Sequence, residues 1–102
     1  MSKKILQINV RFSVSATELA EEFMNAATPI SSVPGLKWKI FGMDEERREG
    51  AGIYLFENAA ALKSYLEGPI IARMNAIEAF SDISFKSFDV VEEATRVTRG
   101  PI

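Results

Sequence analysis

Residues 33–58 read VPGLKWKIFGMDEERREGAGIYLFEN, and this stretch decides the fold of the chain. Pro34 and Gly35 suit a type II turn, and residues 36–43 alternate as a strand does. The polar run at 44–49 predicts a hairpin loop, and residues 50–57 predict the second strand of the hairpin. Gly50 and Gly52 suggest a bulge, or a place where another group approaches the backbone closely.

The segments around the hairpin complete a β-α-β-β-α-β order. Residues 5–12 alternate as a half-buried strand, and Ser15 with Glu18 has the spacing of a capping box for a helix that ends near Pro29. Asn58 is a suitable N-cap for a second helix over 59–67. A third helical stretch covers 70–80, and the last strand covers 83–91. This order predicts a ferredoxin-like α+β fold, an antiparallel sheet with helices on one face. We expect one domain over residues 1–93 and a C-terminal tail over 94–102.

The alternation also assigns faces to the strands. We expect Trp38, with Leu36 and Ile40, to face the helices. The opposite face would then carry Ile5, Phe41, Tyr54 and Phe56, an apolar load too large to remain in water. We therefore predict a homodimer through the sheet faces, with the tail reaching onto the partner.

Composition excludes several classes of function. The 102 residues contain no cysteine and no histidine, which excludes Ser-His and Cys-His nucleophile pairs and histidine-held zinc or haem. Twelve Lys and Arg are scattered among fourteen Asp and Glu, so we expect no nucleic-acid partner. No apolar run approaches the ~20 residues of a membrane span, and no signal peptide is visible. We expect no membrane association, no metal site and a cytoplasmic protein.

Four segments, PGLKWKIF, GAGIYLF, AALKSYLE and FDVVEE, resemble the YdhR family of monooxygenases. That family belongs to the dimeric α+β barrel superfamily, with the antibiotic-biosynthesis monooxygenases. The similarity covers residues 6–93, and Ala51 departs from it where a second glycine would be expected. The resemblance implies a monooxygenase that uses no cofactor and acts on aromatic or polyketide-like phenols and quinols. Haem-using branches of the superfamily rely on a histidine that this chain lacks.

Several side chains are candidates for binding a small aromatic ligand between sheet and helices, although none is singled out as catalytic. They are Trp38, Tyr65, Arg73, Met24, Met74 and Tyr54. Trp38 would be a core residue or a pocket wall with an indole donor, and Tyr54 would more simply pack at the dimer interface. Tyr65 would point its hydroxyl into the cavity, and Arg73 would either border it or be solvated. Met24 and Met74 would be core residues that line an adaptable pocket.

Two other functions remain open from the sequence. A non-catalytic dimer that binds a small ligand or regulates another process would need the same pocket. A polyketide isomerase or cyclase would use the same fold to orient an enolate without oxygen. Fold alone does not choose among the three.

Overall fold

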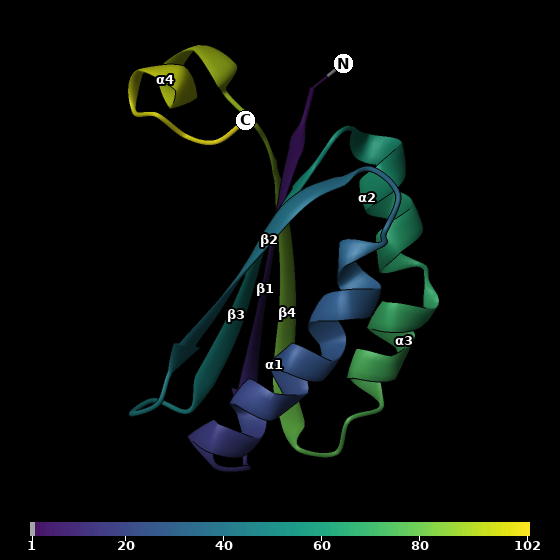
Figure 1. Cartoon of the computed structure of the whole chain (residues 1–102), viewed down its shortest axis with the longest axis vertical. Coiled ribbons are helices and arrows are strands. Elements are labelled where there is room, and N and C mark those ends of the chain that lie inside the picture. The colour runs from purple at the N-terminus through teal and green to yellow at the C-terminus, as the bar shows by residue number, and fades with distance from the viewer. Residues whose placement is uncertain (1) are drawn as a thin grey trace.

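The computed structural model describes residues 2–102 as a sheet with helices packed on one side (Figure 1). The elements, in chain order, are β1 (Lys4–Phe12), α1 (Ala16–Ser31), β2 (Leu36–Asp44), β3 (Glu49–Phe56), α2 (Ala59–Leu66), α3 (Pro69–Asn75), β4 (Phe80–Asp89) and α4 (Glu92–Val97). The strands are ordered β2-β3-β1-β4, and each neighbouring pair is antiparallel. The predicted ferredoxin-like fold is confirmed.

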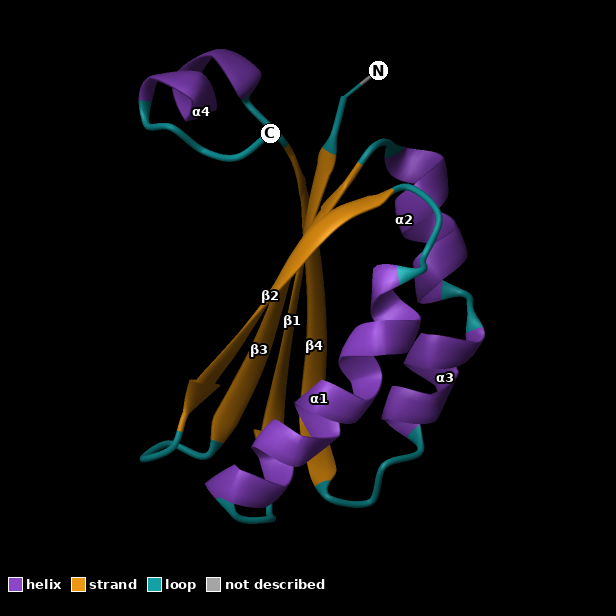
Figure 2. Ribbon diagram, in the orientation of Figure 1, coloured by secondary structure: helices purple, strands orange, loops and turns teal. Residues whose placement is uncertain are grey.

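Helices α1, α2 and α3 cover one sheet face, while the short α4 lies on the other side near the C-terminus (Figure 2). The predicted capping box starts α1, where the Ser15 hydroxyl accepts a hydrogen bond from the Glu18 amide at 3.1 Å. Asn58 caps α2 in the same way through the Ala61 amide at 2.9 Å. α1 runs two residues past Pro29, which lies within its last turn. α3 is shorter than predicted, and Phe80 already belongs to β4.

The central strand β1 supplies the core. The predicted alternation is confirmed, because its helix-facing side chains are at most 5% exposed: Leu6, Ile8, Val10 and Phe12. Leu19 and Ile30 of α1 are buried on the same side of the sheet, as are Leu62 of α2 and Ile71 of α3. Burial of each such side chain stabilises the fold by about 1.5–3 kcal/mol relative to exposure, and this is what holds the helices to the sheet.

Strand β2 changes face near its start, and this corrects the prediction for Trp38. Leu36 pairs with Phe56, but Trp38 pairs with Leu55, so Lys37 is an extra residue in β2. A bulge of this kind reverses the facing of every following side chain. Leu36 packs against the core, whereas Trp38 lies on the sheet face away from the helices. The expectation that Trp38 and Ile40 face the helices is therefore wrong.

The prediction for strand β3 is also wrong, because Tyr54 and Phe56 lie on the sheet face that the helices cover. Tyr54 lies directly across from Leu6 of β1, and both belong to the buried cluster under the helices. Tyr54 is 2% exposed and Phe56 is fully buried, so neither is an interface residue. Phe41 packs against the same cluster. Of the four residues predicted for the open face, only Ile5 lies there, since it pairs with Leu55 and Phe88.

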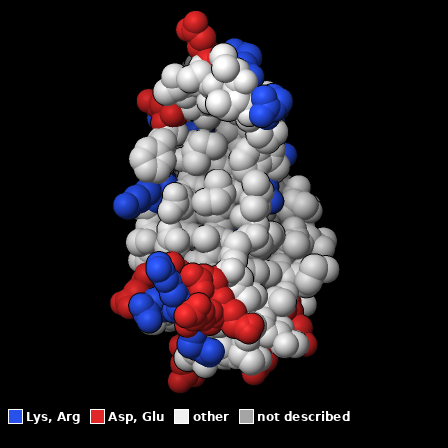
Figure 3. Space-filling model, turned by 90° about the vertical axis from the view of Figure 1, so that its left-hand side faces the viewer, with Lys and Arg blue, Asp and Glu red and all other residues white. Residues whose placement is uncertain are grey.

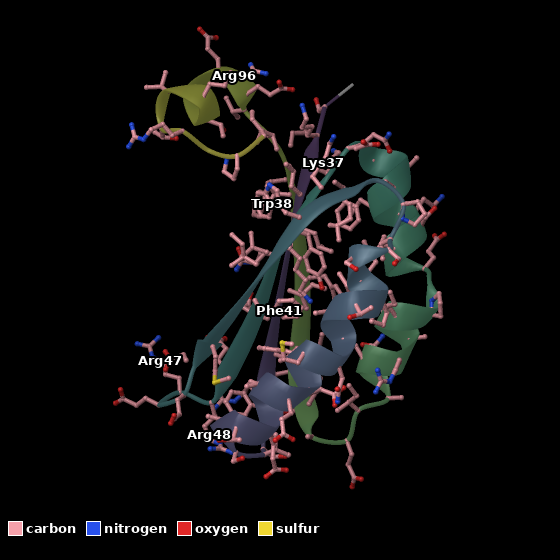
Figure 4. All side chains as sticks on the ribbon, in the orientation of Figure 1. Lys37, Trp38, Phe41, Arg47, Arg48 and Arg96 are labelled. Carbon is pink, nitrogen blue, oxygen red and sulfur yellow. The ribbon has the colours of Figure 1, made fainter. Side chains whose placement is uncertain are left out.

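The C-terminal segment folds back onto its own chain. After α4, the carbonyl of Pro101 accepts a hydrogen bond from the Trp38 indole at 2.7 Å. Figure 4 shows Trp38 on the side of β2 nearest this segment. In the described part of the chain, no helix is long and apolar enough to cross a membrane.

We predict that deletion of Pro101 and Ile102 shifts the fluorescence emission of Trp38 to longer wavelength. The deletion removes the indole acceptor and lets water reach the ring, at a cost of about 1 kcal/mol for the lost hydrogen bond. Trp38 is the only tryptophan, so the emission reports on the surroundings of this one indole ring. Pro101→Ala keeps the carbonyl and should leave the emission unchanged. Identical spectra for the deletion and the full chain would contradict the contact.

Candidate functional site

A cavity of about 260 Å³ lies between the sheet and the three covering helices. This is close to the lower end of the volumes typical of small-molecule sites, roughly 300–1,000 Å³. Its walls are mainly apolar and come from six elements. They include Phe23, Ala26, Pro29 and Ile30 of α1, Phe41 of β2, Tyr54 of β3, Tyr65 of α2, Ile70, Ile71 and Met74 of α3, and Phe80 of β4. Such a lining favours a planar apolar ligand.

Two tyrosine hydroxyls meet at the cavity wall. The hydroxyl oxygens of Tyr54 and Tyr65 lie 2.9 Å apart, and either can be the donor. Their ring centroids are 5.2 Å apart, and Phe56 packs against Tyr65 at 5.4 Å. Since one hydroxyl donates to the other, one proton remains for an oxygen atom of a ligand.

Burial keeps both tyrosines protonated. It raises the pKa of Tyr54 far above its ordinary value, and the neighbouring Tyr65 hydroxyl raises it further. Burial also raises the pKa of Tyr65, although its hydrogen bond to Tyr54 acts in the other direction. The pair can therefore donate hydrogen bonds across the neutral range, but it does not supply a base.

Lys39 brings a charged amine to the same wall. Its Nζ atom lies 3.9 Å from the ring centroid of Phe41 and 4.5 Å from that of Tyr54. Desolvation by burial lowers the pKa of the Lys39 amine from 10.5 to about 8. No carboxylate among residues 2–102 forms an ion pair with it. The amine is thus mostly protonated at pH 7, and its neutral form becomes abundant near pH 8.

A glycine on the neighbouring strand makes room for this lysine. A Cβ atom added to Gly52 would lie 2.9 Å from Cε of Lys39 and 3.0 Å from Cε1 of Tyr54. Both distances are shorter than ordinary side-chain contacts, so a larger residue would displace the lysine. The close approach predicted for Gly52 is therefore confirmed, and the approaching group is a side chain of β2.

One ion pair borders the cavity. Arg73 of α3 lies 3.5 Å from a carboxylate oxygen of Glu22 on α1, and both residues line the cavity. The Arg73 side chain is 63% exposed, so water screens the pair and it contributes little to stability. Arg73 and Glu22 largely neutralise one another, which leaves Lys39 as the unpaired charge at the cavity among residues 2–102.

Of the six predicted ligand-binding residues, the structure brings four together at this cavity: Tyr54, Tyr65, Arg73 and Met74. Trp38 lies on the opposite sheet face and bonds Pro101. Met24 is 73% exposed, so its prediction as a core and pocket residue is wrong. Met24 follows the inward-facing Phe23 on α1, and the helix turns it outward to solvent. The binding roles of the four cavity residues stay predictions.

Lys39 was missed as a site residue. In the sequence Lys39 alternates with Lys37, and two lysines at this spacing predict a solvated side of the strand. Lys37 is indeed exposed and pairs with Glu57 at 3.2 Å, whereas the extra residue in β2 turns Lys39 to the helix side. The signal that could have found it is its spacing from Phe41 together with a glycine-rich partner strand. Figure 4 shows Phe41 beside α1, on the helix side of β2.

A second, more open cavity of about 590 Å³ lies next to the first, between the α1–β2 loop and α2. The two cavities share four wall residues: Pro29, Tyr65, Pro69 and Ile70. Glu57 and Ser64 give the second cavity some polar lining. A ligand substituent that passes Tyr65 would reach this space.

The fold and cavity define a ferredoxin-like α+β domain with a mainly apolar cavity between sheet and helices. The family described as "Putative mono-oxygenase ydhR" matches residues 5–101, and the chain belongs to this family. The predicted resemblance is thereby confirmed. No curated protein matches the chain in sequence.

Solved structures share the fold at low sequence identity. NE2512 from Nitrosomonas europaea, of unknown function, superposes with a TM-score of 0.75 and 17% identity over 89% of this chain and 91% of its own. SnoaB, a cofactor-independent oxygenase from Streptomyces nogalater, superposes with a TM-score of 0.72 and 14% identity over 88% of this chain and 94% of its own. PA3566 from Pseudomonas aeruginosa superposes with a TM-score of 0.72 and 15% identity over 89% of this chain and 96% of its own. At these identities the likeness shows the fold alone.

We predict that Lys39→Met stabilises the protein most strongly below pH 8. In the folded state the pKa of Lys39 is about 8 instead of 10.5, so protonated Lys39 opposes folding below pH 8. Between pH 8 and 10.5 the unfolded chain binds the proton and the folded chain does not, so wild-type stability rises with pH there. The lowering of the Lys39 pKa from 10.5 to about 8 corresponds to an upper limit of about 3 kcal/mol on the gain in unfolding free energy.

The measurement is urea unfolding of wild type and Lys39→Met from pH 6 to pH 10.5. The difference in unfolding free energy should be largest below pH 8 and should shrink as the pH rises. Lys37→Met is the matched control, because Lys37 is exposed and should give a small, flat difference. A pH-independent difference for Lys39→Met would show that its amine is not desolvated.

Proposed function

We propose that this protein is a cofactor-independent monooxygenase acting on aromatic or polyketide-like phenols and quinols bound between the sheet and the helices. One observation carries the proposal. The hydroxyls of Tyr54 and Tyr65 and the amine of Lys39 lie together at the wall of an otherwise apolar cavity. Membership of a monooxygenase family and a fold shared with a cofactor-independent oxygenase support it.

The cavity suits a planar ring. Phe41 and Tyr54 offer aromatic surface on the sheet side, and Phe23 lies 5.0 Å from Phe41 on the helix side. Aromatic contacts of this kind contribute about 0.5–1.5 kcal/mol each beyond the area they bury. The polar groups at one wall would then orient the ring, with its oxygen atom toward Tyr54, Tyr65 and Lys39.

The chemistry requires the protein to make and stabilise a carbanion or phenolate. For an anthrone-type substrate, neutral Lys39 accepts a proton from the ring CH₂ group, and the resulting enolate transfers one electron to O₂. The substrate radical and superoxide combine, and the peroxide takes up a proton and loses water to leave a carbonyl. One oxygen atom enters the substrate and the other leaves as water, so the substrate supplies both hydrogens and all electrons.

Each polar group has a role that its protonation state permits. The tyrosine pair stays protonated and donates a hydrogen bond to the enolate oxygen, which stabilises the anion in a water-poor site. Lys39 is the group whose neutral form is accessible near pH 8, so it is the proton acceptor. Once protonated, the ammonium lies beside the anion that it has created.

We also propose that a second copy of the chain covers the open sheet face. Figure 3 views this side of the molecule, where charged side chains gather toward the ends and uncharged atoms fill the broad middle. Ile40 is 55% exposed and Phe88 53%, and the strand register places both on this face with Ile5 and Trp38. A contiguous exposed apolar surface with a polar rim is typical of a protein interface.

We predict protein-dependent oxygen uptake with an anthrone, with the carbonyl product formed at the same rate. Tyr65→Phe removes a donor to the enolate and should lower the rate on the order of 10²-fold. It should also cost roughly 1–3 kcal/mol of stability, because the buried Tyr54 hydroxyl loses its partner. Lys63→Met on the exposed side of α2 is the matched control and should keep the rate. An oxygen electrode combined with product chromatography makes the measurement.

The same experiment under nitrogen separates the two other functions. Product formed without oxygen would replace the oxygenase with an isomerase or cyclase. Saturable binding with the ligand unchanged in air would replace it with a binding protein. An oxygen-uptake rate in Tyr65→Phe equal to that of wild type would remove the tyrosine pair from the mechanism.

We predict that the chain sediments as a dimer at micromolar concentration and that Ile40→Glu converts it to a monomer. The substitution places a charge in the middle of the proposed interface, where burial without a partner costs several kcal/mol. Met24→Glu is the matched control, since Met24 is exposed on the helix side and should leave the dimer intact. A wild-type monomer at this concentration would refute the interface.

A further inference from the structure

We propose that Lys39 is the counter-ion of the bound ligand, so that the cavity selects planar compounds carrying an ionised oxygen, such as acidic phenols and enolised ketones. The inference rests on the proposed binding of a ligand between sheet and helices. It does not depend on oxygen chemistry, because an oxygenase, an isomerase and a binding protein would all use the same ion pair.

The position of the amine carries the proposal. Lys39 comes from the outer strand β2, yet its Nζ atom lies over the rings of Phe41 and Tyr54, both of which line the cavity. Gly52 leaves the space that the lysine stem occupies. A lysine placed on a strand surface would ordinarily extend its amine into water while its stem covers apolar groups. Here the amine is held at the cavity wall instead.

No charge in the described part of the chain neutralises this amine. Among residues 2–102, Glu22 of α1 is the only carboxylate at the cavity, and Arg73 of α3 already pairs with it at 3.5 Å. Tyr54 of β3 and Tyr65 of α2 are protonated neighbours that pair with each other. Contact with the ring faces compensates only partly for the lost hydration of the ammonium. It favours the protonated form by a factor of about three to thirty.

An ionised ligand would complete the site. Its negative oxygen would accept a charge-assisted hydrogen bond from the Lys39 ammonium, and such bonds are about twice as strong as neutral ones. The unshared tyrosine proton supplies a second donor to the same oxygen. The aromatic walls would hold the ring, so the ligand needs both a planar body and an acidic hydroxyl. Ordinary phenols, with a pKa near 10, fit less well than acidic ones.

The test uses 4-nitrophenol, whose phenol and phenolate forms absorb at different wavelengths, and its methyl ether 4-nitroanisole, which cannot ionise. Both are titrated under nitrogen at pH 6, where free 4-nitrophenol is mostly neutral. Wild type should bind 4-nitrophenol as the phenolate and bind 4-nitroanisole at least about tenfold more weakly. The anaerobic conditions remove any contribution from oxygen chemistry.

Lys39→Met should abolish the phenolate absorption and weaken 4-nitrophenol binding at least about tenfold, while leaving 4-nitroanisole binding unchanged. Lys39→Arg should restore the phenolate absorption, since it restores the charge. Lys63→Met on α2 is the control and should behave as wild type. A structural role of Lys39 would instead weaken both ligands equally.

Three results would overturn the inference. They are phenolate absorption that persists in Lys39→Met, equal loss of both ligands in that variant, and binding of 4-nitrophenol to wild type in its neutral form. Phenolate binding without oxygen uptake on any substrate would support the ion pair and refute the oxygenase. Oxygen uptake that needs Lys39, with 4-nitrophenol bound only as the neutral form, would refute the ion pair and support the oxygenase.

Discussion

The extra residue at the start of β2 determines how both faces of the sheet are used. Leu36 pairs with Phe56 and Trp38 with Leu55, so Lys37 has no partner of its own in β3. From that point the alternation of the strand is reversed. Lys39 and Phe41 therefore turn toward the helices, and Trp38 and Ile40 turn toward the open face. Without this bulge an indole ring would occupy the position from which Lys39 enters the cavity.

The cavity is maintained by groups that are individually unfavourable to bury. Two tyrosine hydroxyls are removed from water, and they share one hydrogen bond at 2.9 Å instead of bonding the backbone. The lysine loses hydration without gaining a carboxylate partner, and this desolvation lowers the pKa of its amine. Local departures from the rules of core packing are commonly found where a protein binds or reacts. The fully buried Leu6, Leu19 and Phe56 provide the surrounding stability that such a site requires.

The sequence was sufficient where one face of an element is clearly polar. β1 has Gln7, Asn9 and Arg11 between its apolar residues, and its buried face was predicted correctly. The capping residues Ser15 and Asn58 were also recognisable, since their chemistry is local. Element order then gave the topology. Residue-level placement failed on β2, because a bulge leaves no periodic signal, and on β3, because both faces of that strand are apolar.

Strand β3 shows why the site itself was only partly predictable. Ile53 and Leu55 on one side are as apolar as Tyr54 and Phe56 on the other, so composition does not tell which pair is covered by helices. Only the pairing of Tyr54 with Leu6 decides it. Tyr65, Arg73 and Met74 were found because α2 and α3 have clear apolar stripes. Lys39 was not found, since its role depends on a strand register that involves residues far apart in the chain.

The same bulge separates two requirements that would otherwise compete for one surface. A ligand site needs polar groups at defined positions within an apolar cavity, whereas an interface between copies needs a broad apolar surface. Alternation on β2 after Lys37 turns Lys39 and Phe41 toward the cavity, and turns Trp38 and Ile40 toward the face that we propose a second copy covers. The outer residues can then be selected for association without changing the cavity. Because β2 is an edge strand, this division is made where the sheet is least constrained by its neighbours.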